Sequence, residues 1–186
     1  MSKIITHLHV RAINACSSQG VLTIGASHFP CRLGKSGRRF HKREGDGASP
    51  IGVFTLEQLY YRADKMLRPR IKFISRPLTE SDGWCDAPSH FSYNRLVKLP
   101  FGGNHEKLWR KDHAYDIVIA TSHNMRPRIR GTGSAIFLHI TDGTKGTEGC
   151  IALSEKHLRA VLNRCSKHTD LVIWPNSGLP SALLRK

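Results

Sequence analysis

Short runs rich in Ile, Val, Thr and Phe recur along this chain, and turns containing glycine, serine or proline separate them. Such runs are typical of β-strands, whereas amphipathic helices need apolar residues at spacings of three and four. The pattern therefore predicts a mainly β protein with a few helices. The expected strands are residues 4–10, 21–26, 28–34, 51–61, 115–121, 134–141 and 170–175.

The one helix that the sequence marks clearly follows Ser154 and is expected over residues 155–165. A serine hydroxyl can accept a hydrogen bond from a free N–H of the first turn, and Glu155 suits the positive end of the helix dipole. The apolar residues recur at i, i+3, i+4 and i+7, the spacing of one buried face: Leu158, Val161, Leu162 and Cys165. Cys165 is therefore interpreted as a core residue.

The segment 76–113 interrupts the strand pattern with a long irregular stretch that contains Trp84, Tyr93, His105 and Trp109. A loop of this length inside a compact domain is usually functional or disordered. Its aromatic content argues against disorder, because disordered segments are poor in aromatic residues. We expect a partly ordered excursion that covers or walls a site. Packing of the excursion onto the sheet explains each aromatic side chain equally well.

A chain of 186 residues is long enough to bury a core without disulfides or metals, so a single domain over residues 1–186 is expected. Its longest apolar runs, such as AIFL and LVIW, are far too short to cross a bilayer. His7, His9 and Arg11 interrupt the apolar residues near the N-terminus, so no secretory signal peptide is visible. We expect no membrane span, and we expect the protein to be a monomer.

The chain carries 29 lysines and arginines against 14 aspartates and glutamates, a formal net charge of +15. A field of this sign attracts polyanions in general. Nucleic acid and an anionic cell-envelope polymer are both candidate partners, and the charge is also consistent with a simple solubility feature. Against a basic nucleic-acid-binding module, no recognisable motif of that class occurs and the basic residues are spread over the whole chain.

Five cysteines stand at irregular spacing: Cys16, Cys31, Cys85, Cys150 and Cys165. An odd number argues against a complete disulfide framework, so at least one thiol should be free. No C-x-x-C pair is present, and the histidines, including HLH at 7–9, lack a convincing spacing for zinc ligands. The sequence therefore predicts no metal site.

Cys150 and His139 are candidates for a nucleophile and its base. A free thiol is mostly protonated at neutral pH, so cysteine catalysis needs a proton acceptor and donors for the oxyanion. His139 ends an expected strand eleven residues upstream, and the glycine-rich loop between the two can bring them together. Gly149 lets the backbone approach a substrate, and its N–H and that of Cys150 can face an oxyanion. Taken alone, a cysteine after glycine usually packs in a core and a strand-end histidine usually lies at a boundary.

The order of strand, His139, loop, TEGCI at 147–151 and helix resembles the catalytic domain of the L,D-transpeptidases, the YkuD-like family, whose motif is Ser/Thr-His-Gly-Cys. EGDGASPIGVFTL at 44–56 resembles the family's Gly-Asp-x-x-Thr/Ser-Pro-x-Gly-x-Phe segment. GWCDAPSHFSYNRLVKLPF and HEKLWRKDHAYD resemble a branch of short bacterial members. The resemblance is strongest in 44–56 and 134–158, and it implies mixed, β-sandwich-like sheets. Glu148 stands where better-studied members have histidine.

The resemblance implies a peptidoglycan L,D-transpeptidase with Cys150 as nucleophile and His139 as base. Cys150 would attack the diamino-acid carbonyl at the third position of a stem tetrapeptide and release the terminal D-alanine, and Gly149 would help to hold the oxyanion. The second ring nitrogen of His139 needs an acceptor, and a backbone carbonyl near residue 140 is expected to supply it. The thioacyl-enzyme would pass to an amine, in cell-wall cross-linking or remodelling, or to water, in an L,D-carboxypeptidase or endopeptidase. Both outcomes remain open, and the resemblance implies that neither needs a cofactor.

The resemblance also implies a substrate and a place. Peptidoglycan stem peptides are the implied partner, and the cell envelope or periplasm is the implied location. His105, Trp109 and Thr147 are expected to bind the substrate. Asp46 and Ser49 are expected to fix turns rather than to do chemistry.

Overall fold

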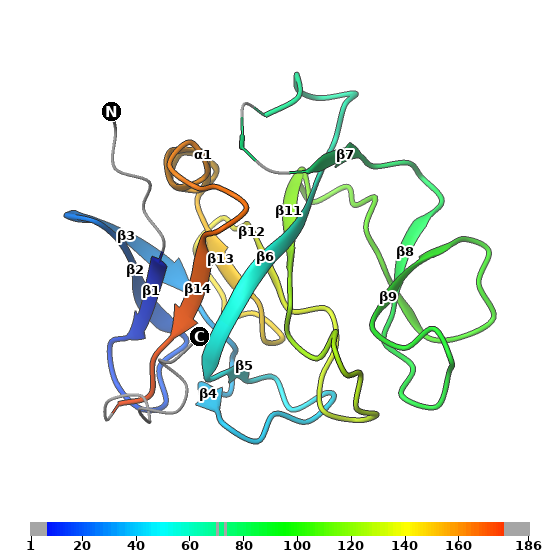
Figure 1. Ribbon diagram of the computed structural model, residues 1–186, viewed down its shortest axis with the longest axis horizontal. Helices are drawn as coiled ribbons and strands as arrows, with labels where there is room; N and C mark the ends of the chain where they lie inside the picture. The colour runs from blue at the N-terminus through cyan, green and yellow to red at the C-terminus, as the bar shows by residue number, and fades with distance from the viewer. Residues whose placement is uncertain (1–6, 70, 73, 177–186) are drawn as a thin grey trace.

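The computed structural model describes residues 7–69, 71–72 and 74–176, and within them the chain forms fourteen β-strands and one α-helix, α1 (Glu155–Leu162) (Figure 1). The prediction of a mainly β protein is therefore confirmed. The strands are β1 His7–Ala12, β2 Gln19–Ile24, β3 Ser27–Arg32, β4 Arg38–Arg39, β5 Ser49–Pro50, β6 Gly52–Tyr61, β7 Ser75–Pro77, β8 Asp82–Cys85, β9 Arg95–Lys98, β10 His105–Lys107, β11 Ile117–Thr121, β12 Phe137–Ile140, β13 Ile151–Leu153 and β14 Asp170–Ile173.

Nine strands form one mixed sheet in the order β11-β12-β13-β3-β2-β1-β14-β6-β7. The first strand in this order, β11, also pairs with β6, so the sheet curls and closes on itself and β7 extends from β6 as a branch. The pairs β1–β14, β12–β13 and β6–β7 are parallel, and the others are antiparallel. Figure 1 shows the long β6 running between β14 and β11. The expected mixed sheets are confirmed.

The interior of the closed sheet is apolar because alternate residues of a strand point to the same face. In β2 the buried positions alternate with more exposed ones, and Leu22 and Ile24 enter the core. The helix α1 adds its own buried face, formed by Leu158, Val161 and Leu162, to the same core. This core is the main hydrophobic contribution to folding.

A second apolar cluster lies on the outer face of β6, β11 and β12. Val118 and Phe137 belong to it, whereas the residue after each of them belongs to the interior core, so both faces of these strands are buried. Trp84 of the excursion packs its ring edge-on against the Phe137 ring, with 5.2 Å between centroids. Cys150 is part of this second cluster. The excursion therefore covers the face of the sheet that carries the candidate nucleophile.

The excursion is more ordered than its sequence indicates. The strands β8, β9 and β10 form a three-stranded antiparallel sheet in the order β10-β8-β9. Asp82, the first residue of β8, is fully buried. It accepts hydrogen bonds from Arg76 Nη2 at 2.6 Å and from Thr79 N at 2.8 Å. These strands are only three or four residues long, too short for a period of two to stand out.

The predicted strands correspond to β1, β2, β3, β6, β11, β12 and β14, with ends that differ by up to three residues. Residues 4–6 of the first predicted strand lie outside the described residues. The short β13 was not predicted. The Ser154 cap is confirmed, since its Oγ accepts from His157 N at 3.4 Å. Cys165 lies just beyond the helix end and is buried, as expected.

All five cysteines are free thiols, and Cys16 alone among them is exposed, so the expectation of at least one free thiol is confirmed. Over residues 7–69, 71–72 and 74–176, no helix is both long enough and apolar enough to span a membrane.

Candidate active site

Parallel pairing of β12 with β13 brings together the two ends of the glycine-rich loop. In this register Leu138 lies beside Ile151, and His139 lies beside Ala152. Residues opposite each other in a sheet point to the same face, and faces alternate along a strand. Cys150 directly precedes Ile151, and His139 directly follows Leu138. The side chains of Cys150 and His139 therefore both lie on the face opposite to that of Leu138 and Ile151, which is the outer face.

A cavity of about 950 Å³ opens over this face, and both Cys150 and His139 line it. Its other walls come from segments that are far apart in the sequence. The loop before β5 contributes Glu44, and the excursion contributes Asp86 and Glu106. The excursion therefore forms part of the cavity wall.

The Cys150 side chain makes two hydrogen bonds, one as acceptor and one as donor. Phe137 N donates to its Sγ at 3.3 Å, and the thiol donates to Ala135 O at 3.1 Å. Burial raises the pKa of the Cys150 thiol well above its ordinary value, the nearby Glu106 carboxylate raises it further, and the Phe137 N–H opposes both. The resting side chain is therefore a neutral thiol.

The His139 ring is oriented by its own strand. Its Nδ1 lies 2.7 Å from Ile140 O, which confirms the expected backbone acceptor near residue 140. A carbonyl oxygen can only accept, so in the neutral ring Nδ1 carries the proton and Nε2 carries the lone pair. Burial lowers the pKa of His139 to about 4, so the imidazole is neutral at pH 7. The Tyr115 ring packs edge-on against it at 5.1 Å.

Gly149 is required by the conformation of the loop. Its φ is +136°, and a Cβ at this position would lie 2.8 Å from Ala48 O. Its N–H donates to Thr147 Oγ1 at 3.1 Å, so the N–H must leave this acceptor before it can hold an oxyanion. Thr147 itself lines the cavity, and its Oγ1 donates to Cys150 O at 2.7 Å.

The segment 44–56 lies under the loop that carries Cys150. The fully buried Ser49 donates from Oγ to Gly149 O at 2.8 Å and accepts from Gly34 N at 2.9 Å. The Asp46 carboxylate accepts from two backbone N–H groups of its own loop, as expected for a turn-fixing residue. Ser49 does more than fix a turn, because it joins the two motifs of the chain.

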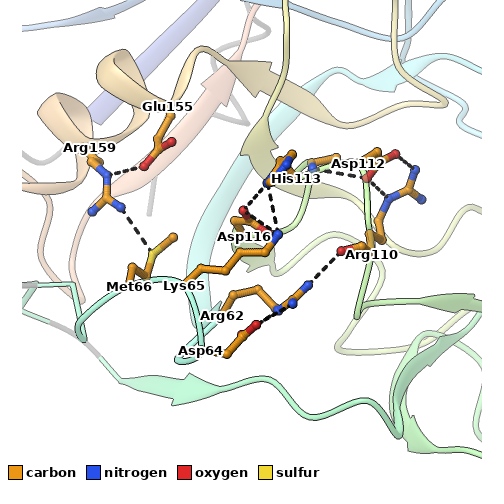
Figure 2. Close-up of polar contacts among 11 residues, drawn as sticks. Arg62, Asp64, Lys65, Met66, Arg110, Asp112, His113, Asp116, Glu155 and Arg159 are labelled. Carbon is orange, nitrogen blue, oxygen red and sulfur yellow. Dashed lines mark hydrogen bonds and ion pairs between the residues drawn. The ribbon is translucent and has the colours of Figure 1, made fainter.

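One rim of the cavity is formed by Arg110, Asp112 and His113, and Figure 2 shows how it is tied to the loop after β6. Lys65 Nζ donates to Asp116 Oδ1 at 2.8 Å, and His113 Nδ1 lies 2.9 Å from Asp116 Oδ2. Arg110 Nε donates to the Asp112 carboxylate at 2.9 Å, and this pairing lowers the pKa of Asp112 to about 2. The rim is therefore cross-linked by several ion pairs.

The family model for the L,D-transpeptidase catalytic domain, YkuD, matches residues 21–173. The chain belongs to this family. Among solved structures, this chain is similar to Bd1075 of Bdellovibrio bacteriovorus, with a TM-score of 0.44 and 11% identity over 91% of this chain and 48% of that one. A search of curated protein sequences found no match.

Two L,D-transpeptidases of Mycobacterium tuberculosis are also similar. L,D-transpeptidase 1 has a TM-score of 0.39 and 13% identity, over 90% of this chain and 61% of that one. L,D-transpeptidase 3 has a TM-score of 0.38 and 12% identity, over 89% of this chain and 60% of that one. The present chain thus spans from about half to about three fifths of the solved chains that it matches.

Five carboxylates that were not predicted as site residues line the cavity of this L,D-transpeptidase domain: Glu44, Asp86, Glu106, Asp112 and Asp142. Tyr115 donates its hydroxyl hydrogen to Glu106, and Tyr93 donates to Glu44. Burial raises the pKa of Asp86 and of Glu106. The signal available in the sequence was the pair of segments GWCDAP and HEKLWR, which carry two of these residues.

Of the residues predicted to bind substrate, only Thr147 lines the cavity. The Trp109 ring is covered by the Arg62 guanidinium, 3.6 Å from its centroid, and the same guanidinium donates to Arg110 O at 2.8 Å (Figure 2). His105 lies in β10, where its Nδ1 is 2.8 Å from the carbonyl oxygen two residues before it. A role for these two side chains in substrate binding stays a prediction.

Glu148 replaces the histidine of the family motif on the edge of the cavity. Its carboxylate lies 2.6 Å from Lys35 Nζ, and its side chain is 73% exposed. An exposed ion pair of this kind contributes little to stability. In the part of the chain that the structure describes, no group of three or more His, Cys, Asp or Glu residues is arranged to hold a metal.

Proposed function

We propose that the protein is a cysteine-dependent peptidoglycan L,D-transpeptidase that acts through a thioacyl-enzyme. The observation that carries this proposal is that Cys150, directly before β13, and His139 in β12 face the same side of the sheet and line one cavity. Membership of the L,D-transpeptidase family supports the reaction class. Peptidoglycan lies in the cell envelope, and we infer that the protein acts there as a single domain.

Acylation begins when a stem tetrapeptide enters the cavity. The thiol of Cys150 leaves the Ala135 carbonyl, its proton passes to Nε2 of His139, and Sγ bonds to the carbonyl carbon of the third residue. Backbone N–H groups at Gly149 and Cys150 stabilise the oxyanion once Gly149 releases Thr147. The carbon–nitrogen bond then breaks, and the imidazolium gives its proton to the departing D-alanine amine.

The second half of the reaction decides between two activities. In transfer, an acceptor amine attacks the thioester, His139 takes a proton from that amine, and Cys150 departs as the restored thiol. Water attacking in place of the amine makes the enzyme a carboxypeptidase or an endopeptidase. The charged groups that an incoming acceptor meets are of both signs, because Arg110 and Lys145 line the cavity together with its carboxylates.

Incubation with purified muropeptides that carry tetrapeptide stems, followed by mass spectrometry, tests the proposal. A cross-linked dimer is expected, together with loss of D-alanine. Shortened or released stems without dimer would assign the hydrolytic activity instead. The variants Cys150→Ala and His139→Ala should each lose turnover by about three orders of magnitude or more while remaining folded. Undiminished turnover in Cys150→Ala would overturn the mechanism.

Labelling with a carbapenem gives an independent measurement, because the family resemblance implies that these β-lactams acylate its cysteine. Trypsin cleaves after Lys145 and Lys156, and the peptide 146–156 contains Cys150 as its single cysteine. The mass shift is expected on this peptide. A shift confined to the exposed Cys16 would count against Cys150 as the nucleophile.

A further inference from the structure

The backbone of residues 133–135 is the surface against which the Cys150 thiol rests. Ala135 O accepts the hydrogen bond from Sγ at 3.1 Å. Ala135 has a φ of +50°, in the left-handed region that residues with a Cβ avoid. A conformation of this kind persists only where its surroundings hold it.

Two neighbouring residues of the excursion hold this segment. Tyr93 Oη accepts a hydrogen bond from Gly133 N at 3.1 Å, and Asn94 Oδ1 accepts one from Ala135 N at 3.2 Å. Both residues are buried, with 3% of Tyr93 and 1% of Asn94 exposed. The excursion therefore reaches the backbone next to the nucleophile through two side chains.

The Asn94 amide is fixed in one orientation. Its Oδ1 also accepts from Trp84 Nε1 at 2.9 Å, and its Nδ2 donates to His123 O at 3.0 Å and Asn124 O at 2.9 Å. A primary amide has two acceptor and two donor positions, and all of them are occupied. Rotation of this amide would break four hydrogen bonds in a buried site, so Asn94 is a rigid acceptor for Ala135 N.

We propose that Tyr93 and Asn94 are positioning residues for the Cys150 nucleophile. They fix segment 133–135, and the carbonyl of Ala135 sets the orientation of the thiol before attack. The inference rests on the proposed function of Cys150. It gives the excursion a part in the reaction that is separate from substrate contact.

The hydrogen bond to Ala135 O has two opposite effects on the thiol. It stabilises the protonated form, because S–H can donate to a carbonyl and a thiolate cannot. It also restricts Sγ to one position at the cavity. Glu106, Tyr115, Lys42 and Arg110 are the titratable groups that act on the thiol from the surrounding elements. Loosening the segment should make the thiol easier to ionise and, at the same time, less well placed for attack. General destabilisation of the fold would not produce this pair of changes.

The variants Tyr93→Phe and Asn94→Gly test the proposal. Tyr93→Phe keeps the ring and removes the hydroxyl, which accepts from Gly133 N and also donates to Glu44. Asn94→Gly removes the amide while its φ of +54° stays accessible to the backbone. Tyr61→Phe is the matched control, because Tyr61 is a buried tyrosine that belongs to the interior core and not to the second cluster. Each protein is first compared with wild type by circular dichroism and urea unfolding.

Two quantities are then measured for each folded protein. The rate of Cys150 alkylation by iodoacetamide is followed against pH through the tryptic peptide 146–156. The kcat and KM for muropeptide turnover are determined separately. In Tyr93→Phe and Asn94→Gly the alkylation midpoint should move to lower pH, and kcat should fall about tenfold with KM within about twofold of wild type. Tyr61→Phe should change neither quantity.

An unchanged alkylation midpoint and an unchanged kcat in folded Tyr93→Phe would overturn the proposal, and so would lost stability without a shift of the midpoint. Should Asn94→Gly not fold, Tyr93→Phe alone decides. The wild-type protein could lack peptidoglycan activity while the midpoint of Cys150 alkylation still moves in Tyr93→Phe. That result would contradict the proposed function and support the positioning of the thiol. The two failures are therefore distinguishable.

Discussion

Cys150 and His139 each lose most of their contact with water, and burial moves their pKa values in opposite directions. The thiol pKa rises and the imidazole pKa falls, so both groups are uncharged at neutral pH. A thiolate–imidazolium pair is therefore not the resting state of this site. Charge develops when a substrate carbonyl is in place to receive the sulfur, which protects the thiol from unproductive reactions in the free protein.

The neutral His139 predicts that the protein loses stability in acid. Its pKa is about 4 when folded against an ordinary 6.5, so the unfolded chain binds more protons between these values. The free energy of unfolding should therefore fall as pH drops from 6.5 toward 4, by about 2 kcal/mol from this residue. Urea unfolding at neutral pH and near pH 4.5 measures the change.

The variant His139→Gln should weaken this pH dependence without abolishing it, because burial also lowers the pKa of His123 to about 4. His41→Gln, at an exposed position, is the control and should retain the wild-type dependence. An undiminished loss of stability in His139→Gln would contradict the prediction.

Gly149 shows a second effect that belongs to a single residue. Gly149→Ala combines an unfavourable φ of +136° with a contact of 2.8 Å to Ala48 O, so a loss of about 3 kcal/mol is expected. Gly143→Ala has a φ of +87° and open space around the new Cβ, so it should lose about 1 kcal/mol. If urea unfolding showed the same loss of free energy of unfolding in both variants, the contact with Ala48 O would not explain the cost at Gly149.

At the scale of elements, the site depends on how β12 and β13 are aligned and on what supports the loop between them. A slip of one residue in the parallel register would turn Cys150 to the interior face while His139 stayed outside. Ser49 opposes such a movement, because its hydroxyl joins Gly149 O to Gly34 N. The segment 44–56 is thus a structural support for the nucleophile loop.

Removal of this support should be measurable in the variant Ser49→Ala. It leaves the buried Gly34 N–H without its acceptor, so the free energy of unfolding should fall by about 1–3 kcal/mol. Ser89→Ala, at an exposed position, should stay within about 0.5 kcal/mol of wild type. Thermal and urea denaturation compare the two, and a cost for Ser49→Ala as small as that of Ser89→Ala would contradict the supporting role.

In the whole molecule, the closed sheet and the excursion have different structural roles. The sheet encloses the interior core, and the excursion covers its outer face and contributes walls of the cavity. Both faces of β12 are consequently buried, and a histidine on this strand is neutral unless substrate or acid changes its surroundings. The excursion therefore influences the chemistry of a residue that belongs to the sheet.

The net charge of +15 acts at the same scale. Electrostatic attraction to an anionic polymer weakens with ionic strength, so binding to purified peptidoglycan sacculi should be strong at about 50 mM salt and lost near about 500 mM. Co-sedimentation measures the bound fraction, with duplex DNA as the comparison polymer. Salt-sensitive binding to DNA without binding to sacculi would favour the nucleic-acid-binding hypothesis.

Local sequence patterns were enough to predict the mainly β class, the cap of α1 and the candidates Cys150 and His139, because periodicity, capping and motifs are encoded in neighbouring residues. The contact of Trp109 with Arg62 and the position of Glu106 in the cavity are visible only in the folded structure. These contacts join segments far apart in the chain, and their pairing depends on strand register and on which surface each segment covers. Local patterns contain no information about either, so the walls of the site emerge only when the sheet closes and the excursion folds over it.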